Sequence, residues 1–316
     1  IRMQVKRWTG LTALAATLVL ATGVNAAQQA PVKYEKWGPQ VDEIIMPIIK
    51  DQEAQRIAFE RGESVVLPGL TRPADIDRIK RNPNADITMN LGFHMFYLAF
   101  NMRRSPLSEL PIRQAIAHVT NRDQIINQLF QGYMLPLDSF VPQSSPFYNE
   151  NIPTYPYNPA RARQILDQAG YKLDSKTGVR IDPKTGQPLR KMYILTPTYE
   201  AAPTSAELGR MIAEAARAVG LPVEAQPMDF PVMLEKIDIF EFDMYVLAWG
   251  LERNPTFLYD FFHSSQDVEA GYNTPGIRNA ELDKVLEGLY YAKTKTEAQN
   301  AADKAQEILA REVPYV

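Results

Sequence analysis

A group of aromatic and polar residues follows the most apolar strand expected in this chain. The strand is predicted at residues 242–248, and the group comes directly after it: Trp249, Glu252, Arg253 and Asn254. A tryptophan offers a large, stiff apolar surface with one hydrogen-bond donor. A carboxylate in a closed, poorly solvated cleft can hold an ammonium group through charge-assisted hydrogen bonds. The residue types therefore predict ligand binding at this point.

Two of these residues have alternative interpretations. Glu252 and Arg253 could pair with each other at the surface, which would contribute roughly 0 to 1 kcal/mol and leave no charge for a ligand. Trp249 could cover the protein's own core instead of a solute. A nearby acidic run is expected to be a solvated helix face rather than a catalytic pair: Glu235, Asp238, Glu241 and Asp243.

The residue types give little support to catalysis. The chain has no cysteine, and its histidines, His94, His118 and His263, are not paired with a second ligand at metal spacing. HExxH, GxSxG and phosphate-binding glycine loops are missing. We therefore expect no catalytic residues, no metal site and no cofactor. A hydrolase whose site is assembled in space stays open, because catalytic triads are spatial rather than sequential.

The ligand-binding group must be positioned by the α/β unit that precedes it. Strands are predicted at 192–195, 222–226 and 242–248, with a helix between each pair, the first helix starting at a capping box of Thr204 and Glu207. This alternation implies parallel neighbours in one sheet, so the loops after all three strands emerge at one edge, where ligands bind in open α/β sheets. The first two loops add further candidates: Thr196, Thr198, Tyr199, Asp229 and Phe230.

Helical periodicity and end signals predict the remaining elements. Residues 41–49 suggest a strand interrupted near Pro47, and 133–157 have no period, as expected of a long loop. Four helices are predicted with both ends: Asp51 to Gly62, Pro111 to Val119, Asn121 to Gly132 and Asn158 to Gly170. Two more are predicted from their N-terminal caps, one at Asn279 and one at Thr296 with Gln299.

The composition and the N-terminal residues limit the class of protein to which the chain can belong. The chain carries 34 basic and 37 acidic residues, which offers no electrostatic footprint for nucleic acid. Residues 1–26 are predicted to be a signal peptide, with Lys6 and Arg7 before a short apolar core and a small-residue cleavage site ending at Ala26. The mature product is then expected to be periplasmic, soluble and, without a cysteine, not lipid-anchored.

Several stretches resemble one family in the same order along the chain. These are "VDEIIMPIIKDQEAQRIAFERGE", "FYLAFNMRRSPLSELPIRQAIAHVTNRDQIINQLFQG", "YNPARARQILDQAGY" and "WGLERNPTFLYDFFHSSQ". Together they are similar to the extracellular solute-binding proteins of family 5, the oligopeptide-, dipeptide- and nickel-binding receptors of ABC importers. Peptide receptors of that family often carry aspartate where this chain has Glu252, which puts amine recognition in doubt.

The resemblance implies the fold, the domains and the function. It implies an α/β fold of the periplasmic-binding-protein type II, with residues 27–96 a remnant of the smaller lobe and 97–316 the large solute-binding lobe. It further implies a monomeric, non-enzymatic receptor that captures a small solute, a peptide, between lobes and delivers it to permease subunits in the membrane. We expect no counterpart of the N-terminal part and C-terminal tail of family members, so a truncated, non-binding fragment is an alternative.

Overall fold

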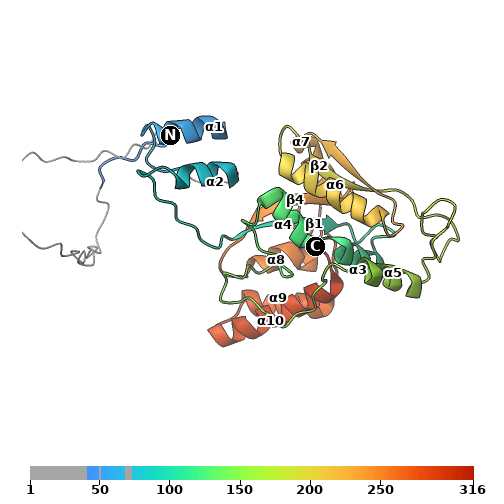
Figure 1. Ribbon diagram of the computed structural model, residues 1–316. Helices are drawn as coiled ribbons and strands as arrows, with labels where there is room; N and C mark the ends of the chain where they lie inside the picture. Colours follow the sequence, from blue (N-terminus) through green and yellow to red (C-terminus); the bar gives the residue numbers. More distant parts are fainter. Residues whose placement is uncertain (1–40, 50, 68–72) are drawn as a thin grey trace, which may run out of the picture. The chain divides into compact units, whose positions relative to one another are not determined.

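The computed structural model describes residues 41–49, 51–67 and 73–316 (Figure 1). The chain divides into two compact units, one reaching to Pro83 and the other running from Asn84 to Val316. The predicted signal peptide, residues 1–26, lies outside the described residues. The division into a smaller-lobe remnant and a large lobe stays a prediction.

The first unit contains the helices α1 (Gln52–Glu60) and α2 (Pro73–Lys80). Asp51 caps α1 by accepting a hydrogen bond from the Ala54 N–H at 2.8 Å, and Gly62 follows its end with a φ of 73°, as the sequence predicted. The predicted strand at 41–49 is wrong, because those residues have no strand structure. Pro47 lacks an N–H for a ladder, and the described part of this unit offers no other strand to pair with.

One four-stranded sheet organises the second unit, in the order β1, β4, β2, β3. The strands are β1 (His94–Phe100), β2 (Met192–Pro197), β3 (Val223–Met228) and β4 (Met244–Gly250). β2 pairs in parallel with both β3 and β4, which confirms the predicted arrangement of these three strands. β1 runs antiparallel to β4. Val316 exchanges two backbone hydrogen bonds with Leu98, so the last residues extend the sheet beside β1.

Helices cover both faces of the sheet. The first face is packed by α3 (Leu110–Val119), α4 (Arg122–Phe130), α5 (Pro159–Gln168) and α6 (Pro203–Arg217). The second is packed by α7 (Phe230–Asp238), α8 (Phe257–Phe262), α9 (Ala280–Tyr290) and α10 (Lys295–Glu312), and α9 and α10 lie side by side in Figure 1. β1 contributes Leu98 to the first core cluster and Tyr97 to the second, as alternation along a strand requires.

Two predicted helix starts are wrong. α6 begins at Pro203, one residue before the predicted cap Thr204, because proline is already suited to the first helical position. Glu207 pairs with Arg210 on the same helix instead of closing a capping box. α10 is capped by Thr294, whose hydroxyl accepts the N–H of the residue three positions on at 3.2 Å, and not by Thr296. Both threonines fit the sequence pattern of a cap, so the pattern alone did not distinguish them.

Candidate functional site

β4 leads out of the core into the candidate site. Met244, Tyr245 and Val246 are buried, Leu247 is half-buried and Ala248 is exposed. An apolar run of this kind is expected to be covered on both faces, and that expectation is wrong for its last residues, Leu247 and Ala248. β4 therefore reaches solvent at Ala248, just before Trp249.

Trp249 is half-buried and packs on the second core cluster. Its ring lies 5.0 Å from the ring of Phe261 and 6.0 Å from that of Tyr272, measured between centroids. Both interpretations of this residue therefore have a basis: its inner side covers the core, and its remaining surface faces solvent at the end of the strand. Its replacement by alanine should cost stability as well as any ligand contact.

Glu252, Arg253 and Asn254 are all exposed. Throughout residues 73–316, neither Glu252 nor Arg253 lies within 4.0 Å of an oppositely charged group, so the suggested pairing of the two with each other is not formed. The backbone of this segment is held by the 133–157 loop, because the Ser145 hydroxyl donates to the Arg253 carbonyl at 2.9 Å. The arrangement presents a carboxylate and a guanidinium that are both available to a ligand.

The loops after β2 and β3 emerge at the same edge of the sheet as the end of β4, because the three strands are parallel. Tyr199 is 63% exposed and Phe230, the first residue of α7, is 44% exposed, while Thr198 is half-buried. Thr196 is different: it is fully buried, and its hydroxyl has no hydrogen-bond partner. It belongs to the interior between β2 and α6 and does not face a ligand.

The acidic run contains one buried member, contrary to expectation. Glu235, Asp238 and Glu241 are exposed, but the Asp243 side chain is only 4% exposed. It is paired with Arg190 at 2.7 Å and lies 3.6 Å from Arg104. Asp243 precedes β4, at the end of the strand opposite to Trp249. Its role is to hold the sheet, and it is not part of the candidate site.

The histidines lie in structural settings. The His118 ring Nδ1 lies 2.9 Å from the Pro156 carbonyl. His263 lies near a serine and a carboxylate, with Nδ1 at 2.8 Å from the Ser265 hydroxyl and Nε2 at 3.6 Å from Glu287. However, the same Nδ1 accepts the Ser265 N–H at 3.1 Å and caps a 3-10 turn, which is a local backbone contact. His94 is exposed at the start of β1.

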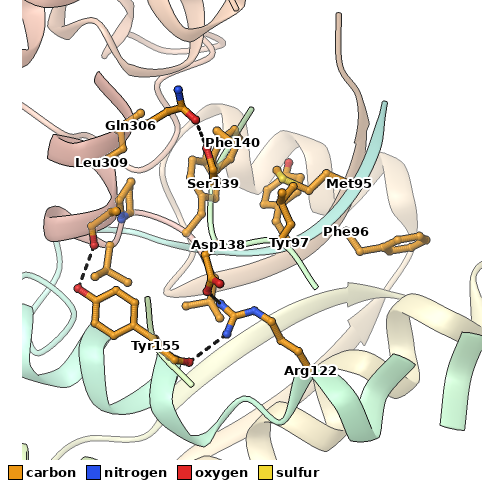
Figure 2. Close-up of a pocket in the computed structure, with 17 residues that line it drawn as sticks. Met95, Phe96, Tyr97, Arg122, Asp138, Ser139, Phe140, Tyr155, Gln306 and Leu309 are labelled. Atoms are coloured by element: carbon orange, nitrogen blue, oxygen red, sulfur yellow. Dashed lines mark hydrogen bonds and ion pairs between the residues drawn. The ribbon is translucent and has the colours of Figure 1, made fainter. Parts of the chain in front are cut away.

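A pocket of about 60 Å³ lies beside β1 and is lined by Met95, Phe96 and Tyr97 of that strand among others. Figure 2 shows the residues that line it. Several of its polar groups already bind each other or the backbone: Arg122 donates to the Tyr155 carbonyl at 3.2 Å, and the Tyr155 hydroxyl donates to the Ala310 carbonyl at 2.9 Å. The Ser139 hydroxyl donates to Gln306 at 2.8 Å. Small-molecule sites usually enclose about 300 to 1,000 Å³. This pocket is too small for a peptide, and the predicted ligand-binding residues do not line it.

Two further observations concern the described part of the chain. It contains no helix that is both long and apolar enough to cross a membrane. It also contains no group of three or more His, Asp or Glu side chains placed to hold a metal ion.

Sequence reasoning did not identify Tyr272, which the structure places beside Trp249. Its ring contacts Trp249, and its side chain is 53% exposed. The strand-end rule considered only loops that follow parallel strands, whereas Tyr272 lies in the loop between α8 and α9. A signal was present in the sequence as an aromatic residue beside glycine and asparagine, at Gly271 and Asn273, which is typical of an exposed turn.

Comparison with known proteins identifies relatives that match much of this chain. The dipeptide-binding protein of Escherichia coli is 25% identical over 240 residues, covering 75% of this chain and 42% of that protein. The nickel-binding periplasmic protein of the same species is 28% identical over 159 residues, covering 49% of this chain and 30% of that protein. The chain spans about half the length of the curated peptide-binding relatives it matches.

The fold is also that of solved receptors. The oligopeptide-binding protein AppA of Bacillus subtilis, solved in complex with a nonapeptide, superposes with a TM-score of 0.71 at 22% identity, covering 85% of this chain and 52% of that chain. The family model of the bacterial extracellular solute-binding proteins, family 5 Middle, matches residues 28–269. Members of this family bind substrates and are not enzymes. The chain therefore belongs to the bacterial extracellular solute-binding proteins of family 5.

Proposed function

We propose that this chain is the substrate-binding component of an ABC importer for peptides, and that it binds solute at the carboxyl ends of β2, β3 and β4. One observation carries the proposal. At this edge of the sheet, exposed aromatic side chains, Tyr199 and Phe230, stand with a carboxylate, Glu252, that has no ion-pair partner in the second unit. Exposed rings can contact the apolar side chains of varied peptides, and an unpaired carboxylate can hold the charged amino group that such peptides share.

The roles of the candidate residues follow from their chemistry. Glu252 accepts hydrogen bonds from the peptide's α-amino group, and Arg253 and Asn254 bind its carbonyl or carboxylate oxygens. Trp249, Tyr199 and Phe230 contact apolar side chains, and Thr198 offers a hydroxyl at the rim. The family relatives named for dipeptides and the receptor solved with a nonapeptide support a peptide over other solutes. A relative named for nickel keeps that ion as the first alternative to test.

A thermal-shift screen tests the proposal directly. The full chain is mixed with di- to pentapeptides, nickel and simple sugars, and the unfolding temperature is measured. A ligand that binds only the folded state at a hundredfold excess over Kd stabilises it by about 2.7 kcal/mol. We expect a shift with peptides. A shift with nickel or a sugar alone would replace the peptide assignment, and a sharp transition that no ligand moves would mean that the chain does not bind alone.

We further propose that residues 1–26 direct export to the periplasm and that the mature protein works there as a monomer beside its permease. The positive start, short apolar segment and small-residue ending support this. Mass spectrometry of the product from a periplasmic extract tests it. The expected mass corresponds to cleavage after Ala26, and recovery of only uncleaved protein from the cytoplasm would contradict export.

A further inference from the structure

Tyr272 and Trp249 form one aromatic wall beside the candidate site. Their ring centroids lie 6.0 Å apart with an interplanar angle of 65°, and both rings contact the buried Phe261, at 5.8 Å and 5.0 Å. Tyr272 is 53% exposed. The rings of Phe261 and Trp249 therefore support the ring of Tyr272, which presents much of its surface to solvent.

The loop that carries Tyr272 is fixed by its neighbour. Asn273 is fully buried, and its side-chain amide donates to the carbonyls of His263 and Ile277 at 3.1 Å and 2.9 Å. Its side-chain oxygen accepts the N–H groups of Gly276 and Ile277, both at 3.1 Å. Every polar atom of this amide is thus used to hold the loop. A side chain next to such an anchor loses little further conformational entropy when a ligand binds.

A second anchor lies on the other side of Tyr272. Asp267 pairs with both Arg103 and Arg278, and Arg103 also donates to the Asn273 carbonyl at 3.1 Å. Between the anchors the backbone is crowded, because a Cβ on Gly271 would lie 2.3 Å from the Gln266 carbonyl oxygen. The loop is therefore held at both ends and closely packed in between, which preorganises the position of Tyr272.

We propose that Tyr272 is a specificity-determining residue, and that with Trp249 it favours peptides carrying an aromatic side chain. The inference rests on the proposed function, because it concerns the same ligand surface. Two rings at a steep angle leave the face of one ring open beside the edge of the other, which suits an offset or edge-to-face contact with a third ring. Such contacts contribute about 0.5 to 1.5 kcal/mol, so the preference should be about two- to twelvefold in Kd.

The test compares peptides that differ only in one ring. Binding of trialanine, Phe-Ala-Ala, Ala-Phe-Ala and Ala-Ala-Phe to the full chain is measured by calorimetry, for wild type and for the variants Tyr272→Ala, Tyr272→Phe and Tyr157→Ala. Tyr157 is a matched control, since it is 52% exposed and lies before α5, among the elements of the first face. Thermal unfolding of each variant checks that it is folded.

We expect at least one phenylalanine peptide to bind the wild type more tightly than trialanine. Tyr272→Ala should abolish that preference, whereas Tyr272→Phe and Tyr157→Ala should keep it. If the wild type binds peptides without preferring a ring, or if Tyr272→Ala keeps the preference, the inference is overturned and the proposed function stands. If the wild type binds none of the peptides, the proposed function fails and the inference with it.

Discussion

The Arg190 guanidinium donates two hydrogen bonds to the Asp243 carboxylate, at 2.9 Å and 2.7 Å. The carboxylate also accepts the backbone N–H of Tyr193 at 3.1 Å. Arg190 precedes β2 and Asp243 precedes β4, so the pair joins the amino ends of two neighbouring parallel strands. The candidate site lies at the opposite, carboxyl ends of the same two strands. By holding β2 and β4 together, this contact helps to fix the relative position of the two loops that follow them.

Asp243→Asn should lower the free energy of unfolding by about 2 kcal/mol, because it removes the charge from a buried pair. The cost is below that of a fully buried pair, since the Arg190 side chain is 41% exposed and water can solvate it. Urea unfolding measures the change. Glu241→Gln is the control: this exposed carboxylate lies 3.4 Å from Lys236, and its loss should change stability by less than about 0.5 kcal/mol. Equal effects of both variants would refute the structural role of Asp243.

Two helical glycines should respond to alanine in opposite directions. A Cβ at Gly209 in α6 would lie 2.5 Å from the Thr196 methyl group, whereas a Cβ at Gly288 in α9 would meet no atom within 4 Å. Gly209→Ala should therefore destabilise the protein by about 1 to 3 kcal/mol through overpacking. Gly288→Ala should stabilise it by about 0.5 to 1 kcal/mol, because alanine is the better helix former. Thermal unfolding of the two variants measures these changes in stability. A stabilising Gly209→Ala would show that α6 can move away from the sheet.

Glu252→Gln should weaken the binding of peptides with a free α-amino group by about tenfold, since a hydrogen bond to a charged group contributes about 1.5 kcal/mol or more. The unfolding temperature should not change, because the side chain is exposed and has no ion-pair partner in the second unit. N-acetylated peptides should bind wild type and variant equally. Glu150→Gln, at another exposed carboxylate in the 133–157 loop, is the control. Equal loss for free and acetylated peptides would argue against amine recognition.

A buried tyrosine cluster should make the protein sensitive to alkali. Burial raises the pKa of Tyr97, Tyr245 and Tyr315 above the usual value for tyrosine, with the charge of neighbouring tyrosines adding to the effect for Tyr97 and Tyr315. A phenol is neutral when protonated, so a raised pKa in the folded state means that the stabilisation is fully present below about pH 10, the pKa in the unfolded chain. It is lost as the pH rises from there through the folded-state values.

Denaturant unfolding at pH 8, 9.5 and 11 measures this loss. We expect little change between the first two values and a marked fall at pH 11. Tyr97→Phe removes one of the buried titrating groups and should reduce the fall, whereas Tyr199→Phe, at an exposed position, should not. A fall at pH 11 that is the same in all three proteins would assign it to other groups, such as lysines.

Local signals in the sequence determined much of the second unit. Asn121, Asn158 and Asn279 each cap the helix predicted for them, because a cap depends only on a side chain and the N–H groups two or three residues on. The alternation of strands and helices between residues 191 and 250 likewise predicted three parallel strands and the edge at which their loops emerge. The exposed residues at that edge, Glu252 among them, were found by the same rule.

Tertiary structure decided the features that depend on contacts between distant segments. The sequence predicted Thr296 as the cap of α10, but the overlapping pattern at Thr294 is the one that starts the helix. The sequence predicted that Asp243 is exposed, but the fold buries it in an ion pair with Arg190. Tyr272 contacts Trp249 only because the loop before α9 brings the two residues together. Periodicity and caps report on neighbours within a few residues, whereas burial and side-chain partners depend on which segments the chain brings together.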